Sequence, residues 1–147
     1  MGLKLRQLPP RLAAGAYILN SGLSKRGLDD DAYAGMQEMA ARAVPQLAQM
    51  SARDFGKLLM RGEVALGAAL LLPVVPSWLV GMGLTGFSAA LLRMYRNSPG
   101  MTIDGIRPTP EGTAVAKDVF LLGIGMGLVL DHITTRNKKK GLLGRKK

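Results

Sequence analysis

Acidic and basic side chains beside long apolar stretches are the residues of this sequence best suited to chemistry. Glu63 and Asp118 each precede an apolar run, with Arg61 and Lys117 close beside them in the chain. An isolated charge in apolar surroundings is unfavourable unless it is paired. We therefore expect such groups to gather at one end of a helix bundle. The predicted polar cluster consists of Arg11, Lys25, Arg61, Glu63, Lys117 and Asp118.

This predicted cluster has two interpretations, and the sequence leaves both open. In the first, the ions neutralise one another and fix the register of neighbouring helices. In the second, they line a polar cavity that takes a small ligand, a proton or a quinone head group. The sequence offers no specific quinone motif, so a quinone is an option and not a derived cofactor.

The composition removes several chemistries from consideration. The 147-residue chain has no cysteine and one histidine, so disulfides, thiolate metal sites and multi-histidine sites are excluded. No Ser-His-Asp, paired-carboxylate or metal-ligand spacing stands out. The glycines of Gly123–Gly127 imitate the start of a nucleotide-binding motif, but no strand precedes them; as a GxxxG pair they favour close helix contact instead. We predict no catalytic residue, no metal site and no cofactor in the chain itself.

The element that must position the acids is a long uncharged stretch, Val64–Leu92. As one straight helix it would be about 43 Å long, against about 30 Å for the hydrocarbon core of a bilayer. Pro73 and Pro76 stand near its middle, where each removes a backbone donor and resists helix continuation. The stretch therefore predicts two membrane-spanning helices joined by a tight turn.

Two further apolar segments complete an all-α fold, an integral membrane four-helix bundle. The first polar connection carries an amphipathic pattern that predicts an extra helix outside the cytoplasm, capped by Asp29–Asp31 and kinked or divided at Pro45. Residues 1–135 form the four-helix domain, and residues 136–147 form a basic, flexible cytoplasmic tail. The predicted spans are about 9–25, 55–72, 77–95 and 112–133.

The charge balance indicates a lipid surface as partner. The net charge is +10, yet 48% of the residues are hydrophobic and only 5% are aromatic, so anionic lipid suits the chain better than nucleic acid. The density of Lys and Arg near the spans places both termini in the cytoplasm. The residues predicted to bind lipid headgroups are Lys138, Lys139, Lys140, Arg145, Lys146 and Lys147.

The chain resembles the DoxX family of small bacterial four-helix membrane proteins, from about Leu8 to Ile133. The resemblance rests on Arg-x3-Gly-x6-Gly-x2-Lys from Arg11 to Lys25, on Glu63 and Gly67 before Leu70–Leu72, and on Ala116–Val119. It implies a bundle in the bacterial plasma membrane. Family members are associated with quinone-linked sulfur oxidation and with membrane complexes that gather redox-defence enzymes.

We therefore expect a non-catalytic accessory subunit of a larger bacterial membrane complex, respiratory or redox-linked, whose partners are the lipid bilayer and other membrane subunits. The alternative is a quinone-interacting subunit of a membrane oxidoreductase. A small transporter is less favoured, because the polar residues are few and lie near one edge of the spans.

Overall fold

Helices build the fold throughout the part of the chain that the computed structural model describes, which is the backbone of residues 4–144 and the side chains of residues 4–135. Only one isolated bridge, between Thr102 and Pro108, adds β pairing within those residues. The predicted all-α class is therefore confirmed. The helices are η1 (Leu5–Gln7), α1 (Leu8–Ser24), α2 (Asp30–Ala43), η2 (Pro45–Gln49), α3 (Ala52–Leu71), α4 (Ser77–Asn97), α5 (Thr113–Ala116) and α6 (Asp118–Gly144).

Local signals explain where these helices begin and end. The side chain of Asp29 accepts a hydrogen bond from the backbone N–H of Ala32 and so caps α2. Ser51 caps α3 in the same way, through the N–H of Asp54. Pro45 separates α2 from η2, because its ring cannot continue the helix.

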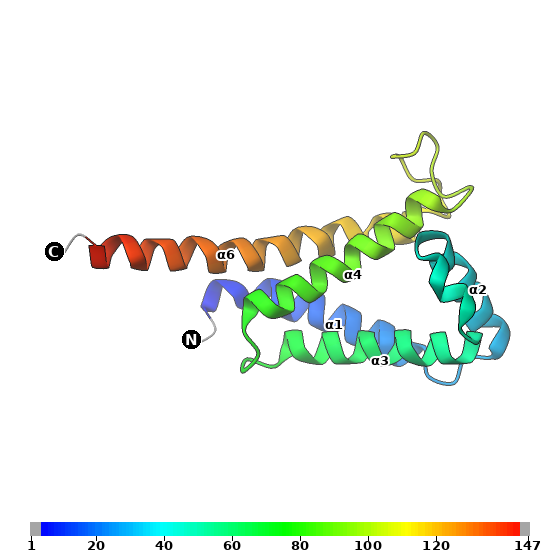
Figure 1. Ribbon diagram of the computed structural model, residues 1–147, viewed down its shortest axis with the longest axis horizontal. Coiled ribbons are helices and arrows are strands. Elements are labelled where there is room, and N and C mark those ends of the chain that lie inside the picture. Colours follow the sequence, from blue (N-terminus) through cyan, green and yellow to red (C-terminus); the bar gives the residue numbers. More distant parts are fainter. Residues whose placement is uncertain (1–3, 145–147) are drawn as a thin grey trace.

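Two antiparallel helix pairs form the body of the molecule (Figure 1). Helix α1 packs along α3, and α4 packs along α6. The pairs meet near the α3–α4 turn and diverge toward the opposite end, where α2 contacts both α3 and α4 (Figure 1). We call the first the turn end and the second the α2 end. The shared core consists of Ala14, Ile18, Leu70, Val80, Leu84, Leu121 and Leu128.

Glycines set the distance between the helices of each pair. A Cβ added to Gly67 would lie 2.5 Å from the backbone nitrogen of Leu19, so α1 and α3 touch through their backbones. Gly81 and Gly125 do the same for α4 and α6, where a Cβ on either would lie 2.9 Å from a backbone oxygen of the other helix. Nothing lies within 4 Å of a Cβ added to Gly123 or Gly127, the predicted contact pair, so neither glycine makes a close helix contact.

The last predicted span differs most from the observed helix. The prediction begins it near residue 112 and ends it near 133, whereas a turn at Lys117 divides it into α5 and α6, and α6 continues to Gly144. Helix α5 begins at Thr113, and just before it the hydroxyl of Thr109 accepts a hydrogen bond from the N–H of Gly112.

Within the described residues, only one of the four predicted spans is both long enough and apolar enough to cross a membrane. The segment Thr113–Thr135 is long and apolar enough to cross a membrane. Helix α1 has only 17 residues. The first twelve residues of α3 carry five charged side chains, Arg53, Asp54, Lys57, Arg61 and Glu63.

Candidate functional site

The α2 end holds a buried ion pair between α1 and α3. The Nζ of Lys25 lies 2.7 Å from Oε2 of Glu63, and the two side chains are 15% and 6% exposed. Lys25 also donates to the hydroxyl and the carbonyl oxygen of Ser21, one turn back on α1. The three N–H groups of the ammonium therefore all have acceptors, one on Glu63 and two on Ser21.

Asp118 is the second acid at this end, and its environment differs from that of Glu63. It is the first residue of α6 and is 7% exposed. Its carboxylate accepts no hydrogen bond and forms no ion pair with any residue that the structure describes, and Glu63 is the charged neighbour whose field reaches it. The positive end of the α6 dipole offsets part of this repulsion. Asp118 is therefore a mostly buried acid whose carboxylate has free acceptor capacity.

The structure brings together only three members of the predicted cluster, Lys25, Glu63 and Asp118. Arg61 and Lys117 are exposed, and neither forms an ion pair with a described residue. Arg11 must be removed from the cluster altogether. It lies 14 residues before Lys25 on the same helix, which is about 21 Å along the axis.

Arg11 instead fastens the turn between α3 and α4. It is 1% exposed. Its Nε donates to the carbonyl oxygen of Leu70 at 2.8 Å, and its two Nη atoms donate to four further acceptors at 2.7–3.0 Å. All five guanidinium N–H groups are thereby used. The remaining acceptors are the carbonyl oxygens of Ala69, Leu72 and Val75 and the hydroxyl of Ser77.

These acceptors are groups that a helix end leaves unpaired. The last carbonyls of a helix have no intrahelical donor, and Pro73 and Pro76 remove two more N–H groups from the turn. The sequence contains this signal, since an apolar helix that ends in two prolines needs a donor from elsewhere. Arg11 was misplaced in the predicted cluster because its charge was weighed and the need of this turn for a donor was not.

Asp131 organises a second network at the turn end, between α6 and the start of the chain. Its carboxylate accepts hydrogen bonds from Lys4 Nζ at 2.8 Å, Arg6 Nε at 2.7 Å and Gln7 Nε2 at 2.6 Å. Gln7 in turn accepts a hydrogen bond from Ser77, so the network joins that of Arg11. The sequence alone did not identify Lys4, Arg6 or Gln7 as partners of Asp131.

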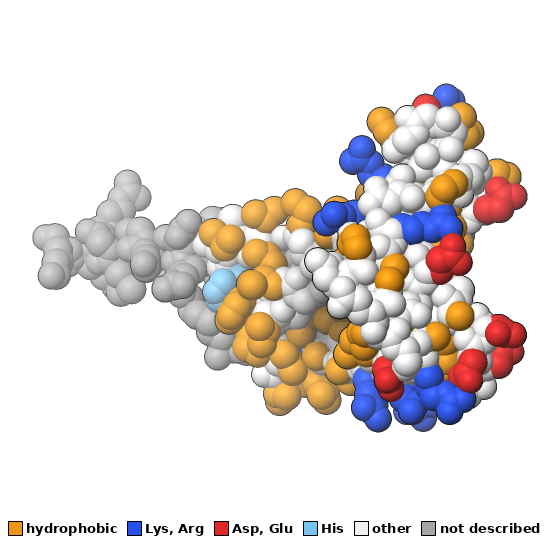
Figure 2. All heavy atoms as spheres, turned by 45° about the vertical axis from the view of Figure 1, so that its right-hand side comes forward, with side chains coloured by type: hydrophobic (Ala, Val, Ile, Leu, Met, Phe, Trp, Pro, Cys, Tyr) orange, Lys and Arg blue, Asp and Glu red, His pale blue; other side chains and the backbone are white. Residues whose placement is uncertain are grey.

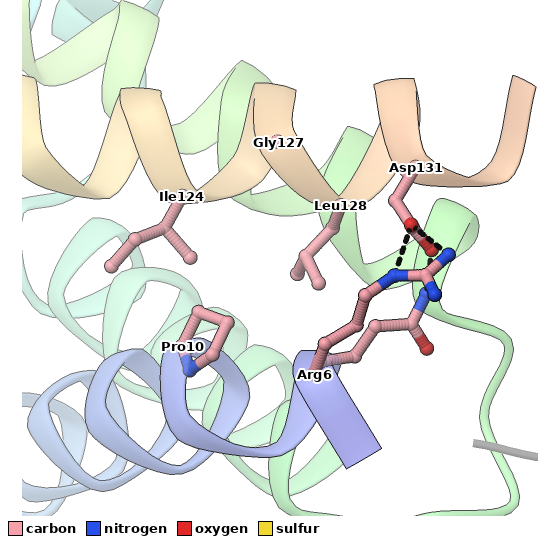
Figure 3. Close-up of a pocket in the computed structure, with 7 residues that line it drawn as sticks. Arg6, Pro10, Ile124, Gly127, Leu128 and Asp131 are labelled. Carbon is pink, nitrogen blue, oxygen red and sulfur yellow. Dashed lines mark hydrogen bonds and ion pairs between the residues drawn. The ribbon is translucent and has the colours of Figure 1, made fainter. Parts of the chain in front are cut away.

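A groove of about 170 Å³ lies beside this network, between α1 and α6 (Figure 3). Pro10 forms its wall on α1, and Leu128 and Ile124 form its wall on α6 (Figure 3). The ion pair of Arg6 and Asp131 stands at one end of it (Figure 3).

The predicted headgroup-binding tail falls at the limit of the description. The backbone at Lys138, Lys139 and Lys140 belongs to α6, but their side chains lie outside the described residues. Arg145, Lys146 and Lys147 lie outside them entirely.

Comparison with known proteins found no match: no family model, no curated protein and no solved structure is similar to the chain.

Proposed function

We propose that the chain is an integral membrane protein with four spans and both termini in the cytoplasm. One observation carries this proposal: large apolar side chains are exposed along the body of the bundle, and on the face that Figure 2 draws the acids and bases gather at the α2 end. Soluble monomers rarely expose a continuous apolar surface of this kind. The exposed apolar residues of the four long helices include Leu12, Tyr17, Leu58, Leu79, Met82, Phe120, Met126 and Leu130.

The packing inside the bundle also supports a lipid environment. The helices of each pair touch through glycine rather than through large side chains, as Gly67 against Leu19 shows. Close backbone contact is the mode of association that remains effective where apolar side chains gain little by leaving the solvent. Polar groups in a lipid environment must find their partners inside the protein. The buried Arg11 at the turn end does so, because its guanidinium is hydrogen-bonded to groups of the protein itself.

Within the membrane, we assign the chain the role of a non-catalytic accessory subunit of a larger bacterial complex, respiratory or redox-linked. The support is the lack of a catalytic motif in the sequence together with the resemblance to the DoxX family. The unpacked glycine Gly123 on α6 adds to this, since it leaves room for a partner helix to approach closely.

Two measurements test this proposal. Purified protein should need detergent to remain monodisperse, and a monodisperse sample in plain buffer would exclude a membrane location. A mild-detergent pull-down from bacterial membranes, analysed by mass spectrometry, should recover the same larger subunits each time. The variant Gly123→Leu should weaken this recovery, whereas Gly35→Leu, on α2 and equally free of neighbours, should not. Equal recovery with both variants would contradict the α6 contact.

A quinone-interacting subunit is the second candidate, and Asp118 is the observation that favours it. A mostly buried carboxyl group without a partner can donate a hydrogen bond to a quinone oxygen when it is protonated. Under this alternative, Asp118→Asn and Glu63→Gln should each lower the quinone-dependent activity of the purified complex at least tenfold. Unchanged activity in both variants would remove this candidate.

A further inference from the structure

We propose that the groove between α1 and α6 binds an acyl chain of an anionic phospholipid, whose phosphate is held by Arg6 and Lys4. This inference rests on the proposed membrane location and names one specific lipid partner of the bundle. The site lies at the turn end, away from Lys25, Glu63 and Asp118.

The shape and lining of the groove suit an acyl chain. Its walls include the apolar side chains of Pro10 on α1 and of Ile124 and Leu128 on α6 (Figure 3). Gly127 also lines it, and nothing lies within 4 Å of an added Cβ there, so the missing side chain leaves space at this position.

The charges at one end of the groove suit a phosphate. Lys4 and Arg6 share the single carboxylate of Asp131, which leaves one net positive charge at this rim. The side chain of Arg6 is 62% exposed, so its guanidinium is accessible to a headgroup. Arginine and lysine beside an apolar groove form the usual pairing for a phosphate with its hydrocarbon chain.

Charge complementarity favours this occupant over a helix from another protein. A partner helix would meet the exposed cation of Arg6 and would need its own acid to match it. A phospholipid with a net negative headgroup supplies the hydrocarbon and the phosphate in one molecule, and the surrounding bilayer provides it at high concentration.

Native mass spectrometry of the detergent-solubilised full chain tests the proposal, with dioleoylphosphatidylglycerol and dioleoylphosphatidylcholine as probes. The wild-type chain should retain one phosphatidylglycerol at least tenfold more tightly than phosphatidylcholine. Gly127→Leu should lower the affinity for phosphatidylglycerol at least tenfold, because its side chain fills the groove. This variant should fold, since the space is open and leucine favours a helix more than glycine does.

Two matched controls isolate the groove and the charge. Gly123→Leu adds the same side chain one turn earlier on α6, outside the groove lining, and should bind phosphatidylglycerol as the wild type does. Arg6→Gln should bring the two lipids to equal affinity, whereas Arg26→Gln, an exposed arginine at the α2 end, should not.

The outcomes separate this inference from the proposed function. If Gly127→Leu retained phosphatidylglycerol as well as the wild type, the groove would not be the lipid site. If the wild type bound both lipids equally, the role of Arg6 and Lys4 would be overturned. The membrane location would survive either result, because it depends on whether the protein needs detergent.

Discussion

The two ends of the helix bundle treat their buried polar groups in opposite ways. At the turn end, Arg11 uses all five of its N–H groups and Asp131 accepts from three side chains. At the α2 end, Lys25 forms an ion pair with Glu63, whereas the mostly buried Asp118 has no partner among the described residues. A saturated network holds a fold together, whereas an unsatisfied buried acid costs stability. The turn end therefore contributes to stability through its polar groups, whereas Asp118 does not.

The largest expected effect tests the structural assignment of the turn end. Arg11→Ala removes the donors of four backbone carbonyls, and we expect it to destabilise the protein by about 4 kcal/mol or more. Arg11→Lys should be intermediate, because an ammonium keeps the charge but cannot span the same acceptors. The measurement is thermal unfolding in detergent, followed by the fluorescence of Trp78, the single tryptophan. An Arg11→Ala variant that unfolds at the same temperature as the wild type would show that Arg11 does not stabilise the turn between α3 and α4.

The ion pair at the α2 end should show the next largest effect. Lys25→Met leaves Glu63 buried and unpaired, and we expect a loss of about 3 kcal/mol. The double variant Lys25→Met/Glu63→Gln should recover most of that loss, because the uncompensated charge is gone. The same unfolding assay measures both. If the double variant were as unstable as Lys25→Met, the loss would come from packing of the lysine stem and not from the charge.

How much of this contrast the sequence predicts depends on the kind of signal. Caps and prolines are local, so the predicted span 9–25 lies close to α1 and the break at Pro45 separates α2 from η2. The charges at the ends of neighbouring helices predicted that Lys25 and Glu63 lie in one cluster, and the structure shows them as an ion pair. The position of Arg11 was misjudged because four of its five acceptors are backbone carbonyl oxygens. Every residue carries this group, so residue types do not mark which carbonyls need a donor.

The glycines show the same limit. Periodicity cannot tell which glycine of a helix faces its neighbour, and the prediction of close contact named only the pair Gly123 and Gly127. The structure places Gly125 against α4, with an added Cβ 2.6 Å from the hydroxyl of Thr85. Helix rotation, which tertiary packing decides, selects among them.

The close approach of α1 and α3, which both ends depend on, gives the third prediction. Gly67→Ala would place a methyl group 2.5 Å from the backbone of Leu19, and backbone cannot move aside as a side chain can. We expect a destabilisation of about 2 kcal/mol. Gly62→Ala, on the same helix with nothing within 4 Å, should instead stabilise the protein by up to about 1 kcal/mol. Equal effects of the two variants would mean that helix propensity, and not contact, governs both.

Asp118 gives a prediction of opposite sign and smaller size. Asp118→Asn removes a buried charge that faces Glu63, and we expect the variant to be more stable than the wild type by about 1 kcal/mol. The matched variant Asp131→Asn, at the saturated end, should be less stable, because Lys4 and Arg6 lose their shared carboxylate. Thermal unfolding in detergent compares the pair. A loss of stability in Asp118→Asn would show that the acid has a stabilising partner and would end the contrast between the two ends.

The smallest effect concerns how α2 is held at its end of the bundle. A side-chain hydrogen bond from Arg53 lowers the pKa of Asp30 below its ordinary value of 3.8. A carboxyl group with a depressed pKa contributes stability above its unfolded-state pKa and loses it as the pH falls through the folded-state pKa. The tether between α2 and α3 should therefore weaken only below about pH 4. Hydrogen exchange of the α2 amides, corrected for intrinsic rates, should show protection that decreases from pH 5 to pH 2.5 in the wild type. Asp30→Asn should lack this decrease, and an identical decrease in both proteins would show that the pair of Asp30 and Arg53 does not cause it.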